Sequence, residues 1–413
     1  WGFNVSLCML LNHFQSNRIM SLDSNTLYDI AIVGAGPAGG SAGIHASKMG
    51  LKTIILEEHA TVGDPVHCGE CLSEIAEVRV NMKFPKEVIA LPVKGVNVIF
   101  PDSHKVKLTE AGFVLEKHAF EKWLASEAQN AGAQLELSTR VTSLARTNGV
   151  WDIQTSKGNT RAKMVIDASG AAGVANRMLQ MNPHFSVTTG IQYEMLDIPH
   201  ENYLDFYLWP RLAPEGYLWM IPKNDWRANV GLVTHDITKA KVYLDQFVKE
   251  MNWTGKKIVK TFGGPIPSSG PMQNTSGDGI MLIGDAAGFT SPLFEGGTQL
   301  GLVSGRMAAE VAKDAFTHNQ FDKAFLSTYD KKWRAEFPPY GKIIKGKEAL
   351  YKFTEDELNR IGHLMPSELS NLTTIDKAKV GFNVLSHNYD LYQKGVVDAF
   401  LAFGYSRAAH YGW

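Results

Sequence analysis

Residues 28–58 read YDIAIVGAGPAGGSAGIHASKMGLKTIILEE, and this stretch decides the fold. An apolar run at residues 30–33 leads into the glycine loop GAGPAG, small residues follow, and a second apolar run ends at Glu57. The spacing of apolar residues and the positions of the glycines predict a strand, a helix that ends at Gly50, and a second strand. In that order the elements form the unit that binds a dinucleotide, which an isolated glycine motif would not establish.

Each part of this unit has a physical task in dinucleotide binding. Gly34 makes the tight turn, Gly36 lets the backbone approach a pyrophosphate, and Gly39 lets the helix pack closely on the strand. The helix N-terminus presents free N–H groups and a partial positive charge to the phosphates. Glu57 follows about 20 residues later, where a carboxylate accepts hydrogen bonds from a ribose.

Bulk properties narrow the class of protein. The chain has 413 residues, of which 44% are hydrophobic and 20% charged, the profile of a soluble globular protein. The 41 basic and 42 acidic residues nearly cancel, which gives no reason to expect a nucleic-acid partner. No apolar run approaches the roughly 20 residues that a transmembrane helix needs.

The cysteines and the N-terminal residues complete this picture. Cys8, Cys68 and Cys71 are too few for a disulfide framework, so we expect a reducing, cytoplasmic location. The chain starts at Trp1, and Met20 precedes the first organised strand. We therefore treat residues 1–27 as a disordered or artefactual extension, with a signal peptide as the less favoured alternative.

The pattern along the chain predicts four further parts. Residues 28–180 and 273–320 carry the α/β pattern of a split nucleotide-binding domain. Residues 181–272 are rich in aromatic and alternating apolar positions, which predicts an inserted antiparallel sheet. Residues 321–413 have helical spacing and a capping box at Thr354.

A second cofactor signal lies about 250 residues after the glycine loop. Strand residues end in Gly284-Asp285-Ala-Ala-Gly, and Gly297 and Thr298 open the next helix. This arrangement suits a carboxylate on a ribityl hydroxyl and N–H groups facing a flavin ring. A helix-capping aspartate in a tight turn is the alternative. Together with the glycine loop, the segment predicts FAD rather than NAD.

A second GxGxxG with its own βαβ unit is missing from the sequence. The flavin therefore needs a reductant that visits the protein, either NAD(P)H or a ferredoxin-type protein. The sequence leaves the choice between these donors open.

Three stretches give the chain a family resemblance. They are the opening GAGPAG…LEE, the loop PVHCGECLS at residues 65–73, and the run GDAAG…EGG…SGRMAAE from Gly284. With these motifs the chain resembles the FAD-dependent geranylgeranyl reductases, from about Tyr28 to the C-terminal helices. The resemblance implies a p-hydroxybenzoate-hydroxylase-like fold: an α/β, Rossmann-like FAD-binding domain with an inserted antiparallel-sheet substrate domain and C-terminal helices.

Motifs and resemblance together predict the site residues. The residues expected to bind FAD are Gly34, Gly36, Ala38, Gly39, Gly40, Glu57, Cys68, Gly69, Cys71, Lys117, Val141, Asp285, Gly297 and Thr298. The family's aromatic substrate motif corresponds here to Tyr217, Trp219, Pro222 and Gly231. The catalytic candidates, each a proton donor or a neighbour of the flavin, are His67, Cys68 and Tyr217. We expect no metal site.

The chain departs from the family pattern at several positions. Ile221 stands where the family has Phe, and Val233 stands where it has Gly. Ser169-Gly170 replaces Asp-Gly in the middle flavin motif, Lys117 replaces an arginine, and Glu295 replaces the first glycine of Gly-Gly-Gly. These departures bear on the preferred substrate and the flavin potential, and they remove no phosphate or ribose contact.

Cys68 and Cys71 form a CxxC pair that has several interpretations. Zinc would need two more ligands at suitable spacing, which the sequence lacks. A reversible disulfide is another alternative. We favour Cys68 as a small side chain beside the flavin ring, because the resemblance covers Cys68 but not Cys71.

The predicted reaction is reduction of isoprenoid double bonds, with a hydride from flavin N5 reaching one alkene carbon and a proton the other. Tyr217 and Trp219 share a face of their strand, either as the wall of a prenyl tunnel or as ordinary sheet core. The resemblance implies geranylgeranyl chains of archaeal-type glycerophospholipids, geranylgeranyl diphosphate, or a chlorophyll or quinone precursor as substrate, with peripheral membrane contact. An aromatic monooxygenase and an electron carrier to quinone are the alternatives.

Overall fold

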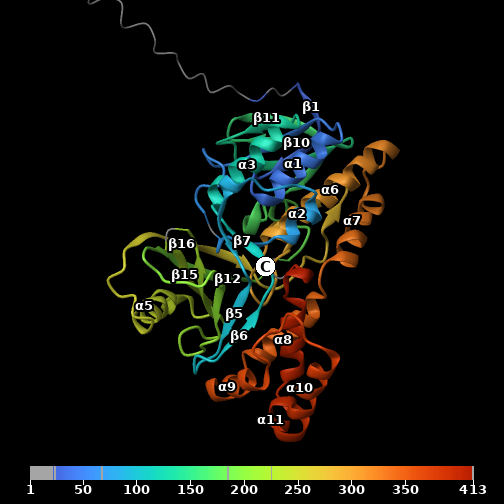
Figure 1. Cartoon of the computed structure of the whole chain (residues 1–413). Coiled ribbons are helices and arrows are strands. Elements are labelled where there is room, and N and C mark those ends of the chain that lie inside the picture. The colour runs from blue at the N-terminus through green and yellow to red at the C-terminus, as the bar shows by residue number, and fades with distance from the viewer. Residues whose placement is uncertain (1–21, 23–24, 67, 184–185, 225, 412–413) are drawn as a thin grey trace, which may run out of the picture.

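The computed structural model describes residues 22, 25–66, 68–183, 186–224 and 226–411. His67 and Cys8 lie outside these residues. Figure 1 shows three regions: a blue and green α/β region, a yellow-green sheet region, and a group of orange and red helices.

The first sheet is the one that the glycine loop predicts. Among the described residues it follows the order β17-β18-β11-β1-β2-β8, and the five strands from β18 to β8 run parallel. A hairpin of β9 and β10 extends from β11. The strands are β1 (Leu27–Val33), β2 (Thr53–Leu56), β8 (Gln134–Glu136), β9 (Val141–Thr147), β10 (Val150–Thr155), β11 (Gly158–Asp167), β17 (Ser276–Gly277) and β18 (Ile280–Leu282).

Helix α1 (Pro37–Lys48) packs between α3 (Lys117–Asn130) and α6 (Thr298–His318) beside this sheet. Glycines make both contacts close. A Cβ on Gly40 would lie 2.9 Å from Leu124 of α3, and one on Gly305 of α6 would lie 2.4 Å from the Ala38 carbonyl oxygen. Helices α2 (Ile75–Val80), α4 (Val174–Leu179) and α7 (Lys323–Glu336) complete the region. Because parallel strands share one carboxyl edge, the loops that follow the parallel strands of this sheet lie along one crevice.

The second sheet confirms the expected antiparallel architecture and extends it. Its order is β16-β12-β15-β14-β13-β5-β6 within the described residues. The strands are β5 (Val96–Ile99), β6 (Lys105–Leu108), β12 (Val187–Met195), β13 (Leu204–Tyr207), β14 (Tyr217–Pro222), β15 (Ala228–Thr234) and β16 (Ile258–Pro267). β5 and β6 come from residues that the sequence placed with the FAD-binding part; parallel pairing of β5 with β13 brings them here.

The faces of this sheet alternate as strand geometry requires. Leu218 and Met220 of β14 pack under α5 (Ala240–Glu250) in one apolar cluster. Tyr217, Trp219 and Ile221 point to the opposite face, in a cluster that they share with the C-terminal helices. A small sheet of β3 (Cys71–Ser73), β7 (Gly112–Leu115) and β4 (Ile89–Val93) lies between the two larger ones.

The C-terminal region is helical, as its spacing predicts. It contains α8 (Tyr340–Leu350), α9 (Glu355–Leu364), α10 (Thr374–His387), α11 (Tyr389–Gln393) and α12 (Val396–Tyr405). The capping box at Thr354 is present at the start of α9. Gly346 lets α8 and α12 meet, since a Cβ there would lie 2.3 Å from the Asp398 carbonyl oxygen. Across the residues the structure describes, no helix combines the length and apolarity needed to cross a bilayer.

Candidate functional site

The turn after β1 shows why its glycines are required. Gly34 has φ of 100°, and a Cβ there would lie 2.6 Å from the Ala168 carbonyl oxygen. A Cβ on Gly39 would lie only 2.0 Å from the Gly34 carbonyl oxygen. The strand, the turn and the first turn of α1 are therefore packed backbone against backbone.

Gly36 differs from its neighbours, because it faces space rather than protein. A Cβ on Gly36 would meet no described atom within 4 Å, and Gly36 lines a cavity of about 270 Å³. The cavity lies at the N-terminus of α1, where backbone N–H groups and the helix dipole favour a phosphate. This open cradle fits the pyrophosphate of a dinucleotide.

Other predicted residues border the same cavity. Glu57, Cys68, Lys117 and Val141 line it together with Gly34 and Gly36. The Glu57 carboxylate accepts hydrogen bonds from the Ala35 N–H at 2.8 Å and from the His59 N–H at 2.9 Å. These bonds hold the carboxylate at the end of β2, where lone pairs are left for a ribose.

Sequence reasoning missed several residues of this cavity. Thr139 and Arg140 follow β8, and Val174 follows β11, whereas Ser169, which also lines the cavity, belongs to the middle flavin motif that the sequence indicated. The available signal was the parallel order of the strands, since loops after β2, β8 and β11 must meet at one edge. Ala38 and Gly40 lie elsewhere: they sit in the contacts of α1 with α6 and α3.

The second predicted flavin segment, residues 284–298, lies against the loop that carries Cys68. Asp285 is partly buried in the 3-10 turn after β18, and the Thr290 hydroxyl donates to its carboxylate at 3.1 Å. Gly297 lies directly over Asp285, because a Cβ there would be 2.9 Å from Oδ1. The Thr298 hydroxyl is 3.9 Å from the Cys68 sulfur. Asp285, Gly297 and Thr298 thus lie together, as predicted, beside the loop that carries Cys68.

Cys68 and Cys71 are both free thiols in this structure. The Cys68 sulfur accepts the Glu70 N–H at 3.2 Å, which turns the loop back on itself. Cys71 lies in β3, where burial first and the neighbouring Cys68 second raise the pKa of its thiol to about 12. A thiol of that kind is a poor nucleophile, so Cys71 is not a reactive partner in this state.

Lys117 carries the positive charge on this side of the cavity. Burial alone would lower the pKa of its ammonium group, but Cys68, Glu121 and Glu70 together raise it above its usual range. Glu121 is one helical turn away, with its carboxylate 2.9 Å from the Lys117 ammonium. The lysine is therefore charged and held in place, as the arginine it replaces in the family would be.

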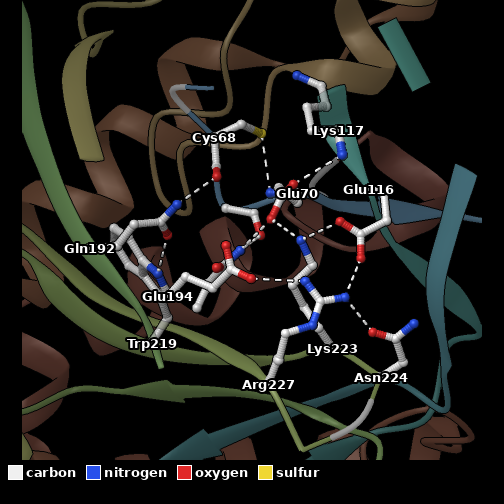
Figure 2. A network of polar contacts seen from close by, with 12 residues as sticks. Cys68, Glu70, Glu116, Lys117, Gln192, Glu194, Trp219, Lys223, Asn224 and Arg227 are labelled. Carbon is white, nitrogen blue, oxygen red and sulfur yellow. Dashed lines mark hydrogen bonds and ion pairs between the residues drawn. The ribbon is translucent and has the colours of Figure 1, made fainter. Parts of the chain in front are cut away.

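A buried ion network anchors the Cys68 loop to the second sheet (Figure 2). Glu70, with φ of 74°, accepts the Lys117 backbone N–H at 3.0 Å and the Asn229 amide at 2.6 Å. The Lys223 ammonium lies 2.8 Å from Glu70 and 3.0 Å from Glu116. Because each buried charge has an opposite charge and hydrogen bonds, the network holds the loop in one position.

Arg227 extends this network along β15. Its guanidinium group bridges Glu116 at 2.5 Å and Glu194 at 2.8 Å. Burial opposes ionisation of Glu116, but Lys223 and Arg227 hold its pKa below the usual value. Burial likewise opposes the charge on Lys223, and Glu70 and Glu116 nevertheless raise its pKa. Sequence reasoning missed this network, whose members are far apart along the chain.

Gln192 links the aromatic motif to the same loop. Its amide nitrogen donates to the Cys68 carbonyl oxygen at 2.6 Å, and its amide oxygen accepts the Trp219 indole N–H at 2.9 Å (Figure 2). Gly231 lies under the indole, since a Cβ there would be 2.6 Å from the Trp219 ring. Trp219 therefore lies flat on β15 and in one orientation. Pro222 ends β14 opposite Ala228.

An apolar wall stands in front of Trp219. The Tyr217 ring contacts the Phe206 and Phe294 rings, at centroid distances of 5.5 Å in both cases. Phe206 and Phe294 line an apolar cavity of about 820 Å³, whereas Tyr217 and Trp219 lie behind them in the described structure. Further lining residues come from β5 and from the C-terminal helices, including Val98, Val384, Phe400 and Phe403. The volume is in the range of about 300–1,000 Å³ that is typical of small-molecule sites.

Two family models match parts of the chain. The one described as a geranylgeranyl reductase catalytic domain matches residues 186–266, which contain β12 to β16 and α5. The one described as an FAD dependent oxidoreductase matches residues 29–178, which contain the glycine loop and the crevice.

Curated relatives match over most of their length. The digeranylgeranylglycerophospholipid reductase of Methanocaldococcus jannaschii is 31% identical over 369 residues, which is 84% of this chain and 93% of the relative. The protein of the same name from Thermoplasma acidophilum is 32% identical, with the same two coverages.

The chain also superposes on solved structures. A geranylgeranyl bacteriochlorophyll reductase-like protein of Thermoplasma acidophilum superposes with a TM-score of 0.82 at 28% identity, covering 90% of this chain and 99% of that one. A flavin-dependent halogenase superposes with a TM-score of 0.67 at 20% identity, covering 90% and 77%, which shows a shared fold.

Proposed function

The chain belongs to the digeranylgeranylglycerophospholipid reductase family, and we propose that it reduces the double bonds of geranylgeranyl chains carried by a membrane lipid. It is an FAD-dependent geranylgeranyl reductase. The observation that carries the lipid assignment is the apolar cavity of about 820 Å³, whose Phe206 and Phe294 wall lies against the aromatic motif.

The residues that the structure describes are suited to binding FAD. Gly36 and the N-terminus of α1 would hold the pyrophosphate, Glu57 the ribose, and Asp285 with Gly297 the ribityl and ring portions. Bound and reduced, the cofactor supplies a hydride. The FAD-binding part of this proposal comprises residues 28–180 and 273–320, and the substrate part comprises residues 181–272 with β5 and β6.

The protein's own contribution is alignment in a dry site. An isolated alkene is not polarised by a neighbouring carbonyl group, so the barrier must fall mainly through orientation, worth roughly 7–11 kcal/mol at best. Phe206 and Phe294 form an apolar surface that orders a prenyl chain, with Tyr217 packed behind them, and the Gln192 link ties the aromatic motif to the Cys68 loop. The electron donor in this proposal visits from outside, as NAD(P)H or a ferredoxin-type protein.

We place the entry for the lipid at the C-terminal helices. Leu385, Tyr392, Val397 and Leu401 line the cavity and are also exposed to solvent, so the cavity opens between them. Ile375 and Phe382 on α10 and Tyr389 on α11 are further exposed apolar side chains of these helices. Exposed apolar side chains on the helices that line an apolar cavity suit contact with the surface of a lipid bilayer.

An anaerobic single-turnover assay tests the proposed reaction. Enzyme reconstituted with FAD and reduced with dithionite is mixed with a geranylgeranyl glycerophospholipid, and the product is weighed by mass spectrometry. We expect a gain of two hydrogens for each double bond reduced. Product that gains oxygen in air and nothing anaerobically would point to a monooxygenase, and fast quinone reduction with an untouched prenyl chain would point to an electron carrier.

A further inference from the structure

Glu295 lies in the segment that joins the second flavin motif to α6. It has φ of 51°, in the left-handed region that glycine favours, and it replaces the first glycine of the family's Gly-Gly-Gly. Its backbone N–H donates to the Ser291 carbonyl oxygen at 3.0 Å, and this bond holds the turn. A charged residue kept in a conformation suited to glycine suggests that the side chain itself has a task.

The Glu295 side chain is almost fully buried, at 4% exposure. Its Oε1 lies 3.2 Å from the Lys347 ammonium of α8, which is also buried. Its Oε2 has no hydrogen-bonding partner among the described residues. Tyr217 of β14 is a further neighbour, since its hydroxyl and the Glu295 carboxyl shift the pKa of each other. Lys347 therefore fixes one carboxyl oxygen, and the other is buried, with the Tyr217 hydroxyl as a neighbour of the carboxyl.

The position of this carboxyl matters as much as its burial. Phe294, the preceding residue, lines the apolar cavity, and Gly297, two residues later, caps α6 and faces Asp285. Glu295 thus lies in the chain between a residue that lines the apolar cavity and the residue that caps α6 over Asp285, while its own side chain lines neither of the two described cavities.

Burial also makes the carboxyl a usable acid near neutral pH. Desolvation raises the pKa of Glu295 to about 7, although Lys347 and Tyr217 act in the opposite direction. Tyr351, which directly follows α8, is a further titratable neighbour: burial first and Glu295 second raise its pKa well above the usual value. A group that titrates near the working pH is the most efficient proton donor.

We propose that Glu295 donates the proton that completes reduction of the alkene. This inference rests on the proposed function. The alkene π bond breaks, one carbon forms a C–H bond with a hydride from reduced FAD, and the other forms a C–H bond with the proton of the Glu295 carboxyl. Both electrons come with the hydride. The carboxylate left behind is stabilised by Lys347 and regains its proton from water.

Tyr217 then acts as a positioning residue rather than as the donor. Its hydroxyl donates to the Phe294 carbonyl oxygen at 2.8 Å, and burial raises its pKa well above the usual value. It holds the Phe294 turn and presents its oxygen to Glu295. Lys347 fixes the other side of the carboxyl.

The test compares Glu295→Gln, Glu295→Gly and a matched control, Glu310→Gln. Glu310 lies in α6, the helix that follows Glu295, and pairs with Arg306 and Lys332. Anaerobic oxidation of reduced enzyme by a geranylgeranyl lipid should slow about 100-fold or more in both Glu295 variants, the scale of general acid catalysis, and not in the control. The wild-type rate should fall as pH rises through about 7, because the donor must be protonated, and this limb should vanish in Glu295→Gln.

An infrared titration of the substrate-free protein gives a readout apart from activity. A carboxylic acid C=O band that disappears near pH 7 should be present in the wild type and in Glu310→Gln, and absent in Glu295→Gln. Glycine readily adopts the φ of 51° found at this position, so Glu295→Gly provides a folded variant for the test if Glu295→Gln folds poorly. Wild-type rates in either folded variant, or an unchanged band, overturn the inference. If the wild type itself reduces no double bond, the proposed function fails instead.

Discussion

At the scale of single residues, two glycines three positions apart have different physical tasks. Gly39 is required by the fold, because any Cβ there would overlap the Gly34 carbonyl oxygen at 2.0 Å. Gly36 has no such packing requirement, because its missing Cβ faces open space in the cavity, and we propose that a ligand requires it. The same motif therefore combines a packing requirement with a binding requirement.

Gly36→Val should separate these two requirements. Its φ of −65° suits valine, so the apoprotein should keep its thermal midpoint, while the side chain blocks the pyrophosphate. We expect FAD affinity to fall at least about 100-fold, which corresponds to roughly 2.7 kcal/mol. FAD fluorescence titration measures it. Gly39→Ala is the companion variant and should lower the apoprotein midpoint itself; stoichiometric FAD in purified Gly36→Val would contradict the assignment of the loop.

Glu295 should make stability depend on pH in a defined direction. Its folded pKa of about 7 exceeds its usual value of 4.5, so the folded state keeps a proton that the unfolded state has lost. Stability contributed by this group is therefore present below pH 4.5 and is lost as pH rises to about 7, by up to roughly 3 kcal/mol. The stability difference between Glu295→Gln and wild type in urea unfolding should grow across that window. A constant difference would show that Glu295 is ionised throughout.

At the scale of elements, β14 and β15 connect the two halves of the site. β14 presents Trp219 to the Cys68 loop through Gln192, and Lys223 at its end reaches Glu70. One strand thus joins the aromatic motif to the flavin loop by one hydrogen-bonded link and one ionic link. Mutations in the strand should therefore affect substrate handling and loop stability separately.

Trp219→Ala should impair turnover of long prenyl substrates without loss of FAD. The variant removes the ring that backs the Tyr217 wall and frees Gln192, so alignment is lost while the crevice is untouched. We expect kcat/KM to fall about tenfold or more, equivalent to roughly 1.4 kcal/mol of alignment. Trp226→Ala, at an exposed tryptophan near the start of β15, is the control. Unchanged kinetics for Trp219→Ala would leave this residue as sheet core alone.

Lys223→Met tests the ionic link. Methionine matches the length of lysine but leaves Glu70 and Glu116 without their shared cation. Removing one partner of a buried ion pair costs about 3–5 kcal/mol, so the urea midpoint should fall clearly. Lys332→Met breaks an exposed pair with Glu310 and should cost only about 0–1 kcal/mol. Equal effects of the two variants would mean that the buried network contributes no more than a surface pair.

At the scale of the whole molecule, the apolar cavity lies between the second sheet and the C-terminal helices. β5, β13 and α10 to α12 all contribute to its wall, so the cavity exists only when the regions are assembled. Exposed apolar side chains lie on α10 and α12, and we propose that they form the face that contacts lipid. Assembly of the regions therefore creates the volume of the cavity.

Phe382→Glu should weaken membrane contact selectively. Phe382 is 66% exposed on α10, and burying such a side chain in lipid is worth about 1.5–3 kcal/mol. Flotation with phosphatidylcholine vesicles, with and without anionic lipid, should show roughly 10- to 100-fold weaker binding. Val242→Glu, an equally exposed apolar position on α5, should bind as the wild type does. Vesicle binding that is the same in all three proteins would remove α10 from the contact.

The sequence by itself determined the cofactor unit and the type of each region. The glycine loop, the first helix and Glu57 lie within 31 residues, and such local spacing sets backbone conformation almost alone. The sequence also predicted the role of Asp285 in the cofactor site, because the strand, turn and helix signals around it are local. The alternating aromatic run predicted the antiparallel sheet, and helical spacing predicted the C-terminal helices.

Only the tertiary structure decided which side chains meet. Lys223 and Glu70 are 153 residues apart, Gln192 and Cys68 are 124 apart, and neither pair has a signal in the spacing. Sheet register pairs Phe206 with Trp219, and the packing of α8 brings Lys347 to Glu295. Local sequence selects conformations, but long-range pairing and burial select neighbours, and a buried neighbour decides whether a carboxyl is a surface charge or an acid.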